Sequence, residues 1–168
     1  MHKKLILRCV LLLVIPPLTR AADIHNVCEL LRDPEALSGK VVKVRGMYFA
    51  TSEASSIQDK RCRDPIDLKG QQWSPGISIA VPDPRSASRE GADFNGQAFK
   101  MLVRTRTEAE RNGEVVVATF EGRLEYCLRF GTLRTGRRLW IGCVGPGGFI
   151  LRLVVKTVDD IRTEPKPN

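Results

Sequence analysis

The stretch KVVKVRGMYFA, residues 40–50, decides the fold of this chain, because apolar and polar side chains alternate along it with the period of a β-strand. One side of that strand carries Val42, Val44, Gly46, Tyr48 and Ala50. Successive side chains of a strand point to opposite faces, so this side can be buried while the other faces water. Residues 40–50 are therefore predicted to form the first strand of a sheet.

Further elements are predicted on both sides of this stretch. Upstream, Asp23 is placed to cap a short helix over residues 24–32, which Pro34 ends. Downstream, the patterns predict strands over 55–68 and 77–81, a loop over 82–92, a helix over 95–111, and strands over 114–127 and 149–158. Five strands with a helix between the third and the fourth is the element order of an OB-fold barrel. The predicted fold class is mainly β with short helices: an OB-like five-stranded barrel with an N-terminal helix.

Both ends of the chain are predicted to lie outside this domain. Residues 1–21 have the features of a signal peptide: a basic start, an apolar run over 9–15, and Thr19-Arg20-Ala21 before a cut at Ala22. The apolar stretch is about ten residues and a spanning helix needs ~20, so we expect no transmembrane segment after its removal; an uncleaved anchor is the alternative. Residues 22–162 form the single domain and 163–168 a loose tail. The protein is expected to be exported to the periplasm or the cell exterior of a bacterial envelope.

The positive charge of the chain is concentrated in one segment. The whole sequence has 27 basic and 19 acidic residues, a formal charge of +8. Residues 1–21 contain four basic residues and no acidic one, so their removal leaves 23 basic against 19 acidic residues, or +4. Residues 126–158 contain six basic residues and no acidic one. The rest of the processed chain then has 17 basic and 19 acidic residues, so any electrostatic function is expected within residues 126–158.

Four cysteines remain after residues 1–21 are removed: Cys28, Cys62, Cys127 and Cys143. In an exported chain of this size, four cysteines most simply form two disulfides. Three pairings are possible, and we prefer Cys28–Cys62 with Cys127–Cys143. The spacing offers no C-x-x-C motif, and His25 is the one histidine near a cysteine, so no metal site and no cofactor are expected.

Residues 24–62 also carry a resemblance to known proteins. The features are a cysteine in a short helix, a turn and an alternating strand: Cys28-Glu29-Leu30-Leu31, Pro34, Leu37-Ser38-Gly39-Lys40, Val42-x-Val44-x-Gly46 and residues 57–62. This stretch resembles small exported bacterial OB-fold-like proteins, in which a Cys-containing helix precedes the first barrel strand. The resemblance implies the fold, and a shared fold does not specify an activity.

The candidate ligand-binding residues are Arg129, Arg134, Arg137, Arg138 and Trp140. They lie between the fourth and fifth predicted strands, in the loop that borders the ligand face of an OB-fold barrel. Guanidinium groups bind oxyanions of many kinds, so this set would suit an anionic polymer or a lipid headgroup, and a partner protein of the envelope is a further option. Export makes nucleic acid an unfavoured partner. In the alternative interpretation the arginines are a solvated hairpin tip and Trp140 covers the core.

No catalytic set is recognisable in the sequence. No acidic or nucleophilic residue stands at a spacing from His25 that would indicate a catalytic pair. Asp59, Asp64 and Asp67 are interleaved with basic residues, which favours an exposed turn of mixed charge over a calcium loop. We therefore expect a non-enzymatic, disulfide-stabilised binding module. The alternatives are a small hydrolase that uses two carboxylates roughly 5–10 Å apart, and a structural or assembly protein of the envelope.

Overall fold

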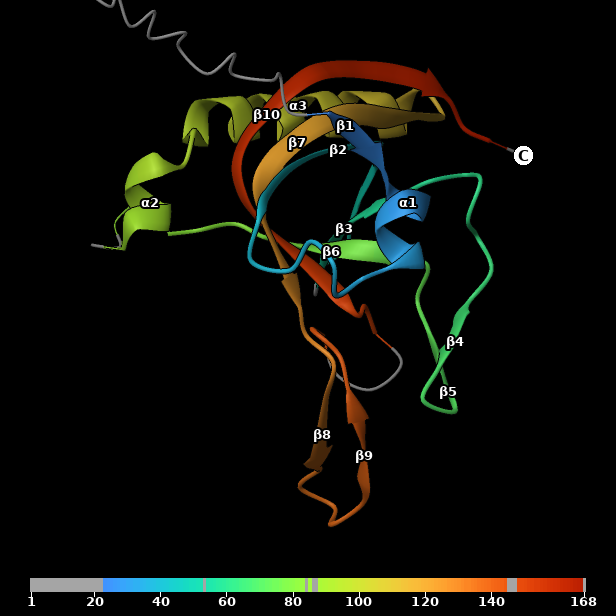
Figure 1. Cartoon of the computed structure of the whole chain (residues 1–168). Helices are drawn as coiled ribbons and strands as arrows, with labels where there is room; N and C mark the ends of the chain where they lie inside the picture. The colour runs from blue at the N-terminus through green and yellow to red at the C-terminus, as the bar shows by residue number, and fades with distance from the viewer. Residues whose placement is uncertain (1–22, 53, 84, 86–87, 145–147, 168) are drawn as a thin grey trace, which may run out of the picture.

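A closed barrel of five strands forms the centre of the molecule in this computed structural model (Figure 1). In order around the barrel, the strands are β2 (Val41–Ala50), β3 (Ser55–Gln58), β6 (Gly76–Ala80), β10 (Leu151–Pro165) and β7 (Glu114–Tyr126). Pairing between β2 and β7 closes the barrel. β6 and β10 run parallel, and the other neighbours in the barrel are antiparallel. The predicted fold class, an OB-like five-stranded barrel, is confirmed.

The structure describes residues 23–52, 54–83, 85, 88–144 and 148–167. The signal peptide predicted over residues 1–21 lies outside the described residues. Within them, the barrel interior is filled by apolar side chains that are nearly inaccessible to solvent, among them Val44, Ile57, Ile77, Phe120, Leu124, Leu151 and Leu153. The side of residues 40–50 that was predicted to be buried faces the barrel interior: Val42, Val44 and Tyr48 are each at most 4% exposed.

Gly122 lies in β7 opposite Val155 of β10, where the two backbones approach each other closely. A Cβ at this position would collide with the backbone carbonyl of Val154 on the facing strand. The register of the two strands shifts immediately beyond this point, between Val155 and Thr157. The extra residue of this bulge is Lys156 of β10. The close approach of the two backbones requires glycine at position 122.

Replacing Gly122 with alanine is expected to lower the free energy of unfolding by about 1–3 kcal/mol, because the added methyl meets backbone that cannot move aside. Urea denaturation followed by far-UV circular dichroism measures the change. The control is Gly96→Ala, where the nearest atom to the added Cβ would be 3.6 Å away in the side chain of Phe94. Equal stability of the Gly122 and Gly96 variants would contradict this prediction.

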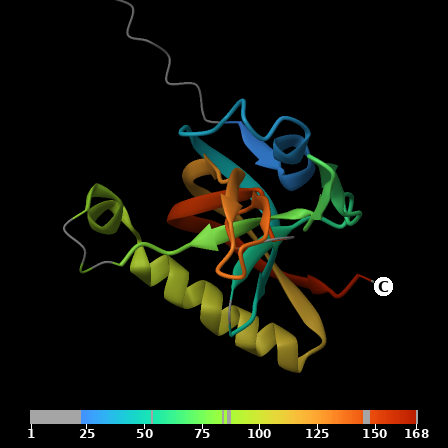
Figure 2. The same ribbon diagram turned by 90° about the horizontal axis from the view of Figure 1, so that it is seen from below.

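Three helices lie outside the barrel among the described residues. α1 (Val27–Arg32) and α3 (Gly96–Arg111) lie on opposite sides of it, and α2 (Arg89–Asp93) precedes α3 (Figure 2). Leu102 and Ala109 of α3 are buried against the barrel.

The prediction that Asp23 caps the first helix was wrong: Asn26 is the cap, and it exchanges hydrogen bonds with Glu29. Residues 24–26 are instead extended as β1 (Ile24–Asn26), which pairs in parallel with β2.

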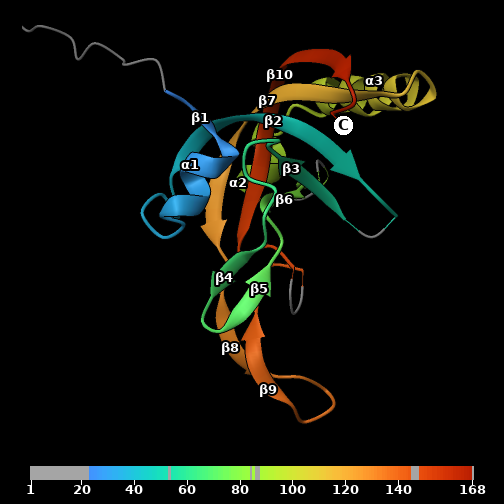
Figure 3. The same cartoon turned by 90° about the vertical axis from the view of Figure 1, so that its right-hand side faces the viewer.

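The second predicted strand, over residues 55–68, is two separate elements. The chain leaves the barrel after Gln58, at the end of β3, and forms a hairpin of β4 (Ile66–Leu68) and β5 (Gln71–Trp73). The turn of this hairpin places Lys69 and Gly70 at φ of 58° and 69°. A second hairpin, β8 (Arg129–Thr132) and β9 (Arg138–Ile141), occupies the connection between β7 and β10. Both hairpins extend from the same end of the barrel (Figures 1 and 3).

The last strand is longer than predicted. β10 runs to Pro165 and pairs with β7 as far as Glu114, so residues 163–165 are not part of a loose tail. The strand continues beyond the predicted end at residue 158, because Asp160, at φ 49°, makes a bulge after which pairing resumes at Arg162. The Asp160 carboxylate accepts a hydrogen bond from Thr119 at 3.4 Å and lies 3.7 Å from Arg45.

Candidate functional site

The β8–β9 hairpin is attached firmly to the barrel at its base. A disulfide joins Cys127 to Cys143 across the base, and another joins Cys28 to Cys62, which is the pairing preferred from the sequence. The amides of Cys127 and Cys143 donate to the carbonyls of Ile150 and Phe149, at 2.9 and 2.7 Å. At the tip, Leu133 donates to the carbonyl of Arg137 at 2.9 Å. The hairpin is therefore an ordered projection of the barrel.

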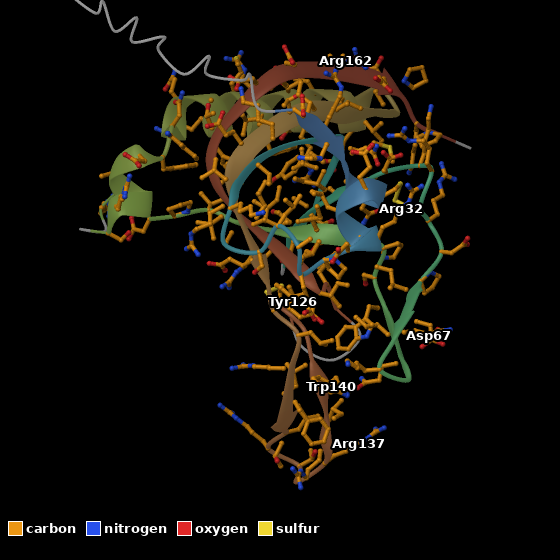
Figure 4. The ribbon with its side chains drawn as sticks, in the orientation of Figure 1. Arg32, Asp67, Tyr126, Arg137, Trp140 and Arg162 are labelled. Atoms are coloured by element: carbon orange, nitrogen blue, oxygen red, sulfur yellow. A yellow bond between two sulfur atoms is a disulfide. The ribbon has the colours of Figure 1, made fainter. Side chains whose placement is uncertain are left out.

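The four predicted arginines are all exposed, but they do not share one face. Arg134 and Arg137 lie in the turn, and Arg137 marks the tip of the hairpin (Figure 4). Arg138 lies opposite Thr132 and Arg129 opposite Ile141. Positions two apart in a strand share a face, so Arg138 shares its face with Phe130 and Trp140, while Arg129 is on the other. Within the described part of the chain, none of the four arginines forms an ion pair.

Aromatic rings and cations stack along one face of the hairpin. The rings of Phe130 and Trp140 meet edge to face, with their centroids 5.4 Å apart. The guanidinium of Arg138 lies 5.1 Å from the Phe130 ring, and the ammonium of Lys69 lies 5.6 Å from the Trp140 ring. These are cation–π distances. Phe130 is 52% exposed and Trp140 is half-buried, so Trp140 neither sits in the barrel core nor projects freely into solvent.

The β4–β5 hairpin holds this aromatic face in place. The side-chain amide of Gln71 accepts a hydrogen bond from the backbone N–H of Trp140 at 2.8 Å and donates one to its carbonyl at 3.4 Å. Lys69, from the turn of the same hairpin, covers the Trp140 ring. Neither Lys69 nor Gln71 was predicted to contribute to the site, because they are far from Trp140 in the sequence and no local pattern links them.

The other candidate groups have structural partners. His25 Nδ1 lies 3.7 Å from Glu29 Oε2 in the first turn of α1. Asp59 was predicted to lie in an exposed turn but is only 9% exposed. Hydrogen bonds from the Arg61 side chain, at 3.0 and 2.6 Å, hold the pKa of that carboxyl below its usual value against the opposing effect of burial. Among the residues that the structure describes, no group of three His, Cys, Asp or Glu side chains could hold a metal ion.

Comparison with protein-family models, curated proteins and solved structures finds no match to this chain. The candidate site therefore rests on its own geometry. Two disulfides are typical of proteins folded in an oxidising compartment. None of the helices in the described residues has the length and apolar character needed to cross a bilayer.

Proposed function

We propose that this chain is an exported binding module whose β8–β9 hairpin holds an anionic ligand. The observation that carries the proposal is the set of four exposed guanidinium groups that have no acidic partner among the described residues. Uncompensated cations on one projection attract oxyanions, and Arg binds them through paired N–H groups. We further propose that the chain is one of the small exported bacterial OB-fold-like proteins that residues 24–62 resemble.

The fold supports this position for a ligand. The loop between the fourth and fifth strands borders the ligand face of OB-fold barrels, and the β8–β9 hairpin is that loop here. The hairpin is also pre-organised, because a disulfide closes its base and Gln71 binds the backbone of Trp140. A site that is already ordered loses less conformational entropy when a ligand binds.

The ligand chemistry we propose is a repeated oxyanion, as in a sulfated or phosphorylated polymer or a surface of anionic lipid headgroups. Arg134 and Arg137 at the tip can contact such a surface without hindrance from the barrel. Arg138 and Lys69 are stacked on aromatic rings, which restrains the side chains but leaves their N–H groups available. Because the arginines are exposed, the attraction is expected to weaken as salt screens it.

Replacing Arg129, Arg134, Arg137 and Arg138 together with alanine is expected to weaken anion binding at least about tenfold, since four cations are removed from one projection. Binding is measured on three probes at low salt: heparin, phosphatidylserine vesicles and single-stranded DNA. The probe that binds the unmodified chain most tightly identifies the source of the oxyanions.

The matched control removes the same formal charge elsewhere, at four exposed basic residues that lie in α2, in α3 or shortly before α2: Arg85, Arg89, Lys100 and Arg104. This control is expected to bind each probe as the unmodified chain does. If no probe binds, or if the two quadruple variants bind equally, the hairpin is not an anion-binding site.

A further inference from the structure

A second candidate site lies on the outer face of β2, remote from the hairpin. Two cavities there, of about 550 and 290 Å³, share Met47, Gln58 and Asp59 among their lining residues and are therefore adjacent; together they are called the groove. Volumes of roughly 300–1,000 Å³ are typical of ligand pockets. Arg162, which lines the groove, and Arg137 at the hairpin tip are at opposite ends of the molecule in Figure 4. The groove is therefore independent of the site proposed above.

The floor of the groove is apolar. Met47 and Phe49 come from the outward side of β2, and Val115 and Val117 from the neighbouring β7. One wall is formed by residues 58–63, which begin at the last residue of β3, and the other by residues 162–167 at the end of β10. From Arg45 to Phe49 the floor spans four residue steps of β2, or about 13 Å at the usual rise of a strand.

The walls are basic. The charged side chains that line the two cavities are Arg45, Lys60, Arg61, Arg63, Arg162 and Lys166, with Asp59 and Glu164 as the acids. Both acids are already bonded within a wall: Asp59 to Arg61 and Glu164 to Arg162, each at 2.6 Å. Six cations against two acids give the lining a formal charge of +4. The groove is therefore complementary to an anionic ligand.

Lys60 and Lys166 supply uncompensated charge on the two walls. Both are exposed, and neither forms an ion pair with any residue that the structure describes. Lys60 lines the larger cavity and Lys166 the smaller one, on opposite walls, so a ligand that extends across both cavities would meet both ammonium groups. Because no folded-state partner depends on these lysines, they can be changed with little effect on the barrel.

We propose that this groove binds a short extended segment of a partner protein in which acidic and apolar residues alternate. Side chains of an extended chain point alternately to opposite sides. The apolar residues of the peptide would therefore lie on Met47, Phe49 and Val117, while its carboxylates lie near the basic side chains of the walls. Aliphatic and thioether side chains dominate the floor, and Phe49 is its one aromatic ring. Nucleic acids and sugars favour stacking platforms of several rings, so this floor fits a peptide better.

The test is fluorescence anisotropy of the full chain with a fluorescein-labelled hexapeptide of alternating Glu and Leu. Two comparison peptides replace Leu with Ser or Glu with Lys. The Glu–Leu peptide is expected to bind at least about tenfold more tightly than either comparison peptide. It alone has both apolar side chains for the floor and carboxylates for the basic walls. Weaker or equal binding of the Glu–Leu peptide overturns the proposal.

Charge reversal locates the binding. The double variant Lys60→Glu with Lys166→Glu is expected to weaken the Glu–Leu peptide about tenfold. The matched control Arg134→Glu with Arg137→Glu makes the same charge change on the hairpin and is expected to leave this peptide unaffected. Loss of peptide binding in the hairpin control, or no loss in the lysine variant, contradicts the groove. Binding of dodecanoate that depends on both lysines, with no binding of the peptide, would identify an amphiphile site instead and would overturn the proposal.

Discussion

Replacing Trp73 with alanine is expected to lower the free energy of unfolding by about 3–5 kcal/mol, the cost of removing a large buried aromatic side chain. Trp73 is 1% exposed, and its Nε1 donates to the carbonyl of Leu68 at 3.0 Å. A Cβ at Gly142 would lie 3.0 Å from the Trp73 ring, so the ring packs directly under the base of the β8–β9 hairpin. The change removes the contact between this base and the β4–β5 hairpin, and heparin binding is expected to weaken with it.

Urea denaturation followed by far-UV circular dichroism measures this loss, because tryptophan fluorescence would itself change with the substitution. Trp73→Phe is expected to cost less, since it keeps most of the ring volume and loses the hydrogen bond to Leu68. Phe130→Ala is the aromatic control at an exposed site, where loss of the ring contacts with Trp140 and Arg138 is expected to cost no more than about 1.5 kcal/mol. A cost for Trp73→Ala no greater than that for Phe130→Ala would show that Trp73 does not support the barrel.

Removing the Cys28–Cys62 disulfide, as Cys28→Ser with Cys62→Ser, is expected to lower the free energy of unfolding by about 3–4 kcal/mol in the chain-entropy model. The two cysteines are 34 residues apart, so the bond closes a long loop that contains β2 and β3 of the barrel. It also ties α1 to the segment that follows β3. The free energy of unfolding from urea denaturation is the measurement.

The Cys127–Cys143 disulfide provides the comparison. It spans 16 residues and encloses the β8–β9 hairpin but none of the barrel strands. Cys127→Ser with Cys143→Ser is therefore expected to weaken heparin binding. It should lower the free energy of unfolding less than removal of the Cys28–Cys62 disulfide does. If the Cys28–Cys62 variant were as stable as the unmodified chain while the Cys127–Cys143 variant unfolded, the assignment of these two roles would be reversed.

The candidate site was predictable in part. The lack of acids in residues 126–158 singles out the arginines of the hairpin directly, because composition is visible without a structure. The partners of Trp140 were not predictable, since Lys69 and Gln71 reach it only when the β4–β5 hairpin folds beside β9. The groove was missed for the same reason. Its two walls are separated by about a hundred residues of sequence, and they flank one floor because β7 pairs with β2 along one edge and with β10 along the other.

The sequence by itself determined the barrel, because alternation along residues 40–50, the order of the other strands and the position of α3 are local patterns that all favour the same fold. The tertiary structure decided where that fold departs from local preference. Residues 24–26 extend as β1 because the edge of β2 offers them backbone hydrogen bonds, and β10 continues past Asp160 because a bulge lets pairing with β7 resume. Such pairings join segments remote in sequence, so their free energy is absent from any local pattern and exists only once the barrel has closed.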